Sequence, residues 1–234
     1  MKVKVFLVTI GLVSSVFVSC QHKSTGEAEI KNEADTISYY LGISIGRNLN
    51  RTPMKDVNID ALVKGMEMVL SGNDTTKDVQ QITMEIGNYM RKLEYAQGQT
   101  NLKEGEAFLD RNKERKGVIT TESGLQYEVL RQGTGPKPKP SDEVTVHYTG
   151  TLIDGTVFES SVDRGEPATF KVNEVISGWT EGLQLMSVGS KYKFYIPTEL
   201  AYGMRPRPGS EIKPNMALIF EVELLSISDT TEQE

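Results

Sequence analysis

The sequence contains few of the residues that carry covalent or metal-dependent chemistry. Its 234 residues include one cysteine, Cys20, and two histidines, His22 and His147. A single cysteine excludes an intramolecular disulfide, and these three residues offer neither a nucleophile with its base nor a set of metal ligands. The formal net charge is −6 and no basic stripe is evident, so we expect no nucleic-acid partner. The sequence therefore predicts a protein without a metal ion or a cofactor.

Long apolar runs are also scarce, and the one at the N-terminus is typical of a secretory signal. Residues 5–18 are mostly apolar, follow two lysines, and are too short to span a membrane comfortably. Cys20 comes directly after a small residue, as in a bacterial lipoprotein cleavage box, although simple cleavage beside an incidental thiol is the alternative. We expect residues 1–19 to be removed and residues 20–35 to form a lipidated N-terminus and a polar tether.

The sequence after the tether predicts two amphipathic helices. Apolar side chains recur at every fourth position from Ile37 to Leu49, along one face of a helix for which Asp35 is the expected N-cap. A second apolar stripe covers residues 58–71, and Gly72 marks the end of that helix. Each helix therefore has an apolar face that must find a partner.

A third helix is predicted to begin near residues 75–76. Its apolar positions between Val79 and Leu93 alternate steps of three and four, as in a coiled-coil seam. After Leu93 the stripe ends, and a helix that is polar nearly all round is usually a connector exposed to solvent. Gly98 and Gly105 weaken this connector by about 1 kcal/mol each relative to alanine, so we expect it to bend there.

The helical region, residues 36–117, has little apolar surface with which to build a core of its own. Either the helices collapse on one another, or they bury their stripes against a second copy of the chain. The methionine-rich seam favours the second alternative. We therefore predict a homodimer that forms through residues 36–93.

The second half of the sequence changes its apolar period to two, which is typical of β-strands. Alternating segments such as EVTVHYTGTL, SKYKFYIP and ALIFEVELLSIS predict an antiparallel sheet, and Asp154-Gly155 predicts a tight hairpin. One short helix is predicted, beginning near Trp179. An α+β fold follows, in which residues 118–228 form an antiparallel β-sheet that curls around this helix, with a tail at 229–234.

Four separated motifs stand out in this half: VHYTGTLIDGTVFESS, VISGWTEGLQLMSVG, LAYG and PNMALIFEVELL. In their order and spacing, over residues 118–227, they resemble the FKBP-type peptidyl-prolyl cis-trans isomerases. The segments SYYLGISIGRNL, LVKGMEMVLSG and NLKEGEAFLDRNKERKGVITTESGLQY resemble the dimeric macrophage infectivity potentiator subgroup of that family. This resemblance implies that two chains interlock their N-terminal helices and that long helices hold two catalytic domains apart.

The resemblance also implies a proline-binding pocket around Trp179, the only tryptophan in the chain. In this family the indole forms the floor of an apolar pocket, and the backbone N–H of Ile176 is the expected donor to a carbonyl of the bound chain. Tyr202 is expected to supply a hydroxyl at the rim. The walls are expected to come from Tyr148, Phe158, Phe220, Val175, Ile176 and Ile212.

One pocket position departs from the pattern of the family. Glu159 stands where the family usually has aspartate, so the carboxylate lies one methylene further from the backbone. Arg164 is in place to pair with Glu159, and we expect the pair to form. His147 has the opposite strand parity from Tyr148 and is expected to point away from the pocket.

The loop GMRPRPGSEIKPN is more basic and richer in proline than the minimal family pattern, with Arg205 and Arg207 expected near the rim. Loops of this kind tune which residues are accepted beside the proline. Ala168 replaces an aromatic residue of the small single-domain relatives. The pocket is therefore expected to keep the chemistry of the family.

The resemblance implies a peptidyl-prolyl cis-trans isomerase that accelerates rotation of X-Pro bonds during the folding of exported proteins. Its expected ligands are proline-containing polypeptides and macrolide inhibitors such as rapamycin. The alternative is a dimeric chaperone that holds unfolded chains, with isomerisation secondary. With a lipid on Cys20, the expected location is the bacterial cell envelope, as an outer-membrane lipoprotein facing the periplasm.

Overall fold

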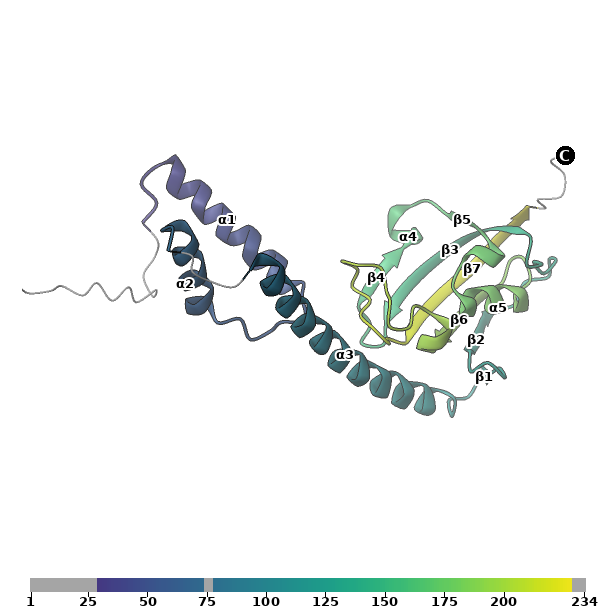
Figure 1. Ribbon diagram of the computed structural model, residues 1–234. Helices are drawn as coiled ribbons and strands as arrows, with labels where there is room; N and C mark the ends of the chain where they lie inside the picture. The colour runs from purple at the N-terminus through teal and green to yellow at the C-terminus, as the bar shows by residue number, and fades with distance from the viewer. Residues whose placement is uncertain (1–28, 74–77, 229–234) are drawn as a thin grey trace, which may run out of the picture. The chain divides into compact units, whose positions relative to one another are not determined.

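The computed structural model describes residues 29–73 and 78–228 of the chain (Figure 1). The predicted signal peptide, the predicted lipidation site and the start of the third helix near residues 75–76 lie outside the described residues. Helices come first along the chain and an antiparallel sheet follows, which confirms the predicted α+β fold. Among the helices of the described part of the chain, none combines the length and the hydropathy needed to cross a bilayer.

The first helix, α1 (Glu33–Asn50), begins earlier than the sequence suggested, and Asp35 is not its N-cap. The side-chain oxygen of Asn32 accepts a hydrogen bond from the backbone N–H of Asp35 at 3.0 Å, so Asn32 caps the helix. Asparagine and aspartate are about equally good caps, and the apolar spacing alone does not choose between them. The Asp35 carboxylate instead accepts from the backbone N–H of Lys31 at 2.9 Å.

The second helix, α2 (Ile59–Leu70), agrees with its prediction to within a residue. Asn58 caps it by accepting a hydrogen bond from the backbone N–H of Ala61 at 3.0 Å, and Ser71 ends it. Gly72 follows with a φ of 71°, a conformation that glycine adopts without steric cost. No side chain of α2 is buried, so its apolar stripe lies on the surface of the chain.

The third described helix, α3 (Val79–Asn112), is one continuous helix capped by Asp78. Its residues 79–97, which we call the exposed half, carry the predicted apolar seam, and Val79 and Ile86 are 73% and 60% exposed. The prediction of a solvent-exposed, bent connector beyond Leu93 is wrong for residues 98–112, which we call the docked half. Four of its residues are buried on one face: Gly98, Asn101, Gly105 and Asn112.

The docked half of α3 is anchored to the sheet at its C-terminal end. The side-chain amide of Asn112 donates to Gln126 Oε1 at 2.8 Å, and Gln126 Nε2 donates to the carbonyl of Leu109 at 2.9 Å. Arg115 lies 2.8 Å from Glu128 in an ion pair and donates to the hydroxyl of Tyr195 at 2.9 Å. These bonds join the helix to two neighbouring strands of the sheet.

Seven strands in the described part of the chain form one sheet in the order β1-β2-β6-β7-β3-β4, with β5 paired to β3 (Figure 1). Every pair is antiparallel. The predicted hairpin at Asp154-Gly155 joins β3 to β4, and Gly155 has a φ of 90°. The strands are β1 (Val118–Thr120), β2 (Gln126–Arg131), β3 (Glu143–Leu152), β4 (Val157–Ser160), β5 (Ala168–Lys171), β6 (Lys191–Ile196) and β7 (Leu218–Ser228).

The predicted short helix is α5 (Ser177–Leu185), which packs against β6 of the sheet. Gly178 and Gly182 face this strand and leave no room for a side chain. A Cβ at Gly178 would lie 2.5 Å from Ile196 Cγ2, and one at Gly182 would lie 2.7 Å from Phe194 Cε1. Because both positions lack a side chain, the helix backbone comes close enough to bury Trp179 against the sheet.

Four short elements were not predicted from the sequence. They are the strand β1, the one-turn helix α4 (Ser161–Arg164) and the 3₁₀ turns η1 (Val172–Glu174) and η2 (Thr198–Leu200). Ser160 caps α4 by accepting from the backbone N–H of Asp163 at 3.1 Å. Segments this short leave no periodic signal in a sequence, and only their capping residues mark them.

Candidate active site

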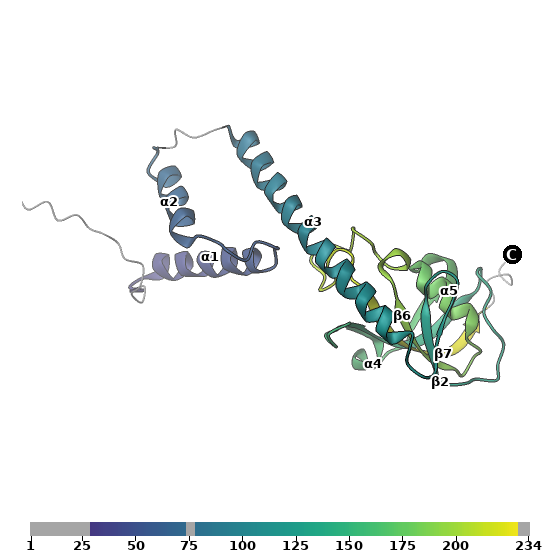
Figure 2. The same cartoon turned by 90° about the horizontal axis from the view of Figure 1, so that it is seen from below.

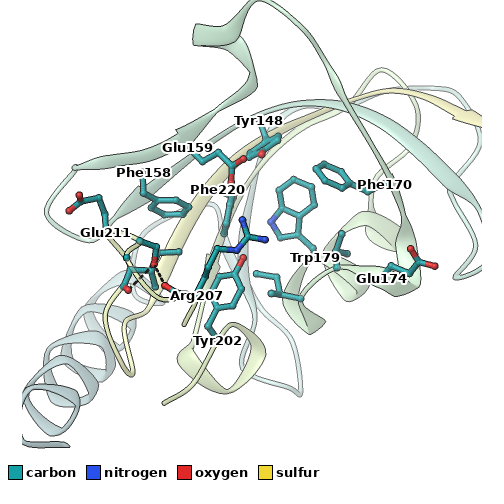
Figure 3. Close-up of a pocket in the computed structure, with 15 residues that line it drawn as sticks. Tyr148, Phe158, Glu159, Phe170, Glu174, Trp179, Tyr202, Arg207, Glu211 and Phe220 are labelled. Atoms are coloured by element: carbon teal, nitrogen blue, oxygen red, sulfur yellow. Dashed lines mark hydrogen bonds between the residues drawn. The ribbon is translucent and has the colours of Figure 1, made fainter. Parts of the chain in front are cut away.

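A cavity of about 750 Å³ opens where the N-terminal end of α5, four strands and the loop before β7 meet (Figure 3). Nine of the ten pocket residues predicted from the sequence line it, and the tenth, Arg164, forms an ion pair with Glu159. The lining residues are Tyr148, Phe158, Glu159, Phe170, Glu174, Val175, Ile176, Trp179, Tyr202, Arg207, Gly209, Ser210, Glu211, Ile212 and Phe220.

Trp179 lies among three aromatic rings and is only 4% exposed. Its indole makes edge-to-face contacts with Tyr148, Phe170 and Phe220, at centroid distances of 5.2, 5.6 and 5.3 Å. Each contact of this kind contributes about 0.5–1.5 kcal/mol beyond the burial of area. The indole Nε1 is buried and has no hydrogen-bond partner among the described residues. Ring packing therefore fixes the orientation of the indole.

Phe158 and Phe220 form a second wall, and Gly150 makes room for it. The two rings cross at 84° with their centroids 5.5 Å apart. Gly150 of β3 pairs in register with Phe220, and a Cβ at this position would lie 2.6 Å from the Phe158 ring and 2.9 Å from the Phe220 ring. Sequence reasoning missed Gly150 because a glycine within a strand signals only a close approach, without naming what approaches.

Tyr148 reaches the cavity because the residues of β3 alternate between the two faces of the sheet. Burial raises the pKa of its hydroxyl to about 12, and a hydrogen bond to Glu159 contributes to the increase. The hydroxyl is therefore neutral near pH 7. His147, on the other face, hydrogen-bonds through Nδ1 to Ser161 Oγ at 3.1 Å and does not line the cavity, as predicted.

The predicted pair of Glu159 and Arg164 is present at the mouth of the cavity. Arg164 NH1 lies 3.5 Å from Glu159 Oε1, and both side chains are about half exposed. The Arg164 guanidinium carbon also lies 5.9 Å from the centroid of the Tyr148 ring. A pair this exposed contributes about 0–1 kcal/mol to stability, so its main effect is to hold the carboxylate beside Tyr148.

The remaining rim comes from Tyr202 and from the loop that follows it. Burial of the Tyr202 ring raises the pKa of its hydroxyl, and the negative charge of Glu159 adds to the increase. Arg207 lines the cavity with its neighbours Gly209, Ser210 and Glu211, whereas Arg205 does not line it. The basic loop expected near the rim therefore contributes one of its two arginines.

Phe170 and Glu174 line the cavity and were not among the predicted site residues. Phe170 lies two residues after Ala168 on β5, so strand parity puts both on the same face, and this signal could have identified it. Glu174 lies in the short turn η1, whose three residues are too few to show an apolar period. Ala168 has no aromatic ring, and the ring on this face of β5 is that of Phe170.

The cavity suits an uncharged apolar ring attached to a polar backbone. The ring of Trp179 and those of its aromatic neighbours form one wall of the cavity, and the charged side chains of Glu159, Arg207 and Glu211 also line it (Figure 3). The Ile176 carbonyl already accepts hydrogen bonds from the N–H groups of Trp179 and Thr180, at 2.9 and 3.0 Å. The role of the Ile176 N–H as a donor to a bound chain stays a prediction.

Comparison with known families accounts for both halves of the chain. Residues 135–225 match the family described as FKBP-type peptidyl-prolyl cis-trans isomerase. Residues 34–129 match the domain described as amino-terminal to FKBP-type peptidyl-prolyl isomerase. The second of these matches ends within β2, the strand to which the docked half of α3 is hydrogen-bonded, and the first begins shortly after that strand.

Two similar proteins cover most of the chain. It is 45% identical over 213 residues to FkpA of Aeromonas hydrophila, an FKBP-type peptidyl-prolyl cis-trans isomerase, with 86% of this chain and 79% of the relative covered. It is 40% identical over 231 residues to the outer membrane protein MIP of Legionella longbeachae, with 96% and 98% covered. Both similarities extend through the helical region as well as the sheet.

A solved structure has a similar fold. The crystal structure of FkpA from Escherichia coli superposes with a TM-score of 0.65 at 35% identity, covering 86% of this chain and 99% of that chain. The family descriptions and the relative from Aeromonas hydrophila name the same activity, which is rotation about the peptide bond that precedes proline. The chain therefore belongs to the FKBP-type peptidyl-prolyl cis-trans isomerases.

Proposed function

We propose that the cavity around Trp179 is the place where the X-Pro bond rotates. Rotation about a peptide bond has a barrier of about 18–20 kcal/mol because the planar form is stabilised by resonance. The twisted form has less charge separation than the planar form, so a dry aromatic cavity favours it relative to the planar substrate. No covalent bond is made or broken, and the cavity needs only shape and a few oriented donors.

The proline ring would lie on the face of Trp179, between the walls formed by Tyr148, Phe158 and Phe220. The N–H of Ile176 and the hydroxyl of Tyr202 would donate to carbonyls that flank the proline. Both tyrosines at the site have a raised pKa, so they act as neutral donors over the physiological range. The observation that carries this proposal is the set of six aromatic rings that line the cavity, five of which contact one another.

The test is cis-trans isomerisation of a short Xaa-Pro peptide by residues 21–234, with and without rapamycin. Because Trp179 is the only tryptophan, its emission reports on the cavity directly. We expect the protein to accelerate isomerisation, and we expect rapamycin to inhibit it and to change the emission. An unchanged rate with a folded protein would contradict the proposal.

A matched pair of substitutions separates the cavity from the rest of the domain. Phe158→Leu alters the wall of the cavity. Phe108→Leu is the control: Phe108 is a half-buried residue of α3 whose ring centroid lies 6.0 Å from that of Tyr195, and it does not line the cavity. We expect Phe158→Leu to lower kcat/KM about tenfold or more, the effect of losing about 1.4 kcal/mol in the transition state. Phe108→Leu should leave kcat/KM within a factor of two.

The apolar faces of α1, α2 and the exposed half of α3 support a homodimer. Leu41 of α1, Val69 of α2 and Ile86 of α3 are 59%, 60% and 60% exposed in the single chain. Apolar faces this open are typical of surfaces that another protein covers. A second copy accounts for three such faces at once, and sedimentation should give twice the mass of the chain.

The exposed faces also favour a second candidate function, in which they hold unfolded polypeptides. Removing residues 36–93 distinguishes the two roles. We expect the shortened protein to be a monomer that still acts on short peptides but assists slow-refolding proteins less well. Equal activity on a slow-refolding protein would contradict the assignment of any folding role to the helical region.

For location, we propose the cell envelope, with a lipid on Cys20 and the protein facing the periplasm. The support is the signal-like N-terminus and the similarity to a protein named as an outer membrane protein. The expected result is a mature protein whose mass is increased by acyl chains and which sediments with outer membranes. Cys20→Ser should release it into the soluble fraction, and a mature protein without added mass would refute the lipid.

A further inference from the structure

The docked half of α3 packs directly behind the loop that forms one side of the cavity. This loop, residues 203–217, we call the rim loop, and five of its residues line the cavity. Figure 2 shows the docked half running beside this loop, shown in yellow. The same loop therefore has one side towards the substrate and the other towards the helix.

Two reciprocal hydrogen bonds connect the helix and the rim loop. The side-chain amide of Asn101 donates to the carbonyl of Pro214 at 2.8 Å, and that of Asn215 donates to the carbonyl of Gly98 at 3.2 Å. Asn101 and Asn215 are both 8% exposed, so water does not replace these bonds readily. A buried amide that loses its hydrogen-bond partner lowers the free energy of unfolding by about 1–3 kcal/mol. This cost holds the helix and the loop in one relative position.

The helix can approach the loop this closely because it carries glycine where the two meet. A Cβ at Gly98 would lie 3.1 Å from Met204 Sδ and 3.2 Å from Pro214 Cβ. A Cβ at Gly105 would lie 3.1 Å from Ala217 Cβ. The contact therefore continues along the loop to its last residue.

Asn215 also closes the base of the rim loop. Its backbone N–H donates to the carbonyl of Gly203 at 2.8 Å, joining the two ends of the loop. Among the described residues it is the only non-glycine with a positive φ, 57°. A conformation of this kind persists only where surrounding contacts hold it. One residue thus closes the loop, and its side chain fixes the closed loop to α3.

We propose that Asn101 of α3 is a positioning residue for the isomerase site, acting through the rim loop. It touches no substrate, and it fixes the loop that carries Arg207, Glu211 and Ile212 into the cavity. The docked half of α3 is then a working part of the catalytic domain. This inference rests on the proposed use of the cavity for X-Pro binding.

The test compares Asn101→Ala with Asn88→Ala in the full mature chain. Asn88 is an exposed asparagine of the exposed half of α3 that accepts a hydrogen bond from Arg91, so it controls for the loss of an asparagine from the helix. For Asn101→Ala we expect KM for a short Xaa-Pro peptide to rise by roughly threefold to tenfold, with kcat changed less than twofold. Asn88→Ala should leave both parameters unchanged.

A second variant and a second measurement keep the test decisive. Asn215→Gly keeps access to the positive φ but removes the bond to Gly98, and we expect the same rise in KM as for Asn101→Ala. Amide hydrogen exchange of the rim loop should increase in both variants, while exchange in β3 and β7 stays as in the unaltered protein. Localised loosening with a KM effect is a result that a merely structural role would not give.

The outcomes separate failure of this inference from failure of the proposed function. An unaltered protein without peptide activity would refute the use of the cavity for isomerisation. An active protein whose Asn101→Ala and Asn215→Gly variants fold and keep the original KM would overturn the positioning role. An equal KM change in Asn88→Ala would also overturn it, because the effect would then belong to the helix in general.

Discussion

The two halves of α3 have opposite composition and opposite burial. The exposed half, residues 79–97, carries an apolar seam, yet Val79, Ile82 and Ile86 are exposed in the single chain. The docked half, residues 98–112, is mostly polar, yet two glycines and two asparagines on one face are buried. Within one helix, hydrophobicity therefore does not indicate which residues are packed inside the chain.

The difference in burial follows from the part of the chain that packs against each half of α3. The docked half meets a loop and a strand whose backbone carbonyls and side-chain amides need partners, so small and hydrogen-bonding residues fit there. In the described part of the chain, no residue of the exposed half is buried. An apolar seam left open is the expected form of an interface with a second copy.

The largest expected effect comes from placing a charge on the seam. Ile86→Glu would bury an unpaired carboxylate in the proposed dimer interface, which costs about 2–5 kcal/mol, or a factor of about 30 or more in the dimer dissociation constant. Analytical ultracentrifugation over a range of concentrations measures this shift. Because Ile86 is exposed in the single chain, unfolding of the isomerase domain should be unaffected. A dissociation constant equal to that of the unaltered protein would show that the seam is not part of the dimer interface.

A smaller effect is expected from adding a side chain to the docked face. Gly105→Leu would press against Ala217, and overpacking of this kind costs about 1–3 kcal/mol of the free energy of unfolding. The matched change Gly87→Leu adds a side chain to the exposed half, where a Cβ would meet only Arg91 NH1 at 3.7 Å. Urea unfolding followed by Trp179 emission should show a loss for Gly105→Leu and none for Gly87→Leu. Equal losses would mean that the two halves pack alike.

The smallest expected effect concerns the pH dependence of stability at the hydrogen bonds of Tyr195, which lie where the C-terminal end of α3 meets the sheet. Burial raises the pKa of Tyr195, whose neutral hydroxyl donates to Glu128 at 2.8 Å and accepts from Arg115 at 2.9 Å. Its contribution is fully present below the ordinary tyrosine pKa of about 10 and is lost as the pH rises through the higher folded-state pKa. Tyr195→Phe should therefore lower the free energy of unfolding by about 1 kcal/mol at pH 8 and by progressively less at alkaline pH. A difference that stays constant with pH would contradict this assignment.

Much of the fold could be predicted because its signals are local. The period of two along β3 correctly places Tyr148 inside and His147 outside. The end of α2 was predicted because the chain needs a positive φ there, which Gly72 adopts. The N-cap of α1 was placed wrongly because Asn32 and Asp35 are both good caps. Local rules therefore give the type of an element more reliably than its first residue.

The docking of α3 could not be predicted because its partners are distant in the sequence. Asn101 and Pro214 are more than a hundred positions apart, and Asn101 carries no apolar signal. Gly98 and Gly105 predicted a bend because glycine weakens a helix. The sequence does not show that the rim loop packs into the space that the missing side chains leave. In the cavity, the aromatic motifs pointed to Trp179 and its walls, whereas Phe170 and Gly150 required knowledge of the strand pairing.

Amide hydrogen exchange along α3, measured in the mature protein at several concentrations, tests the contrast between its halves most directly. We expect residues 98–112 to exchange slowly at every concentration, because their packing lies within one chain. We expect residues 79–97 to exchange faster on dilution, because their partner is a second chain. Equal protection of both halves at all concentrations, or faster exchange in the docked half, would contradict this contrast.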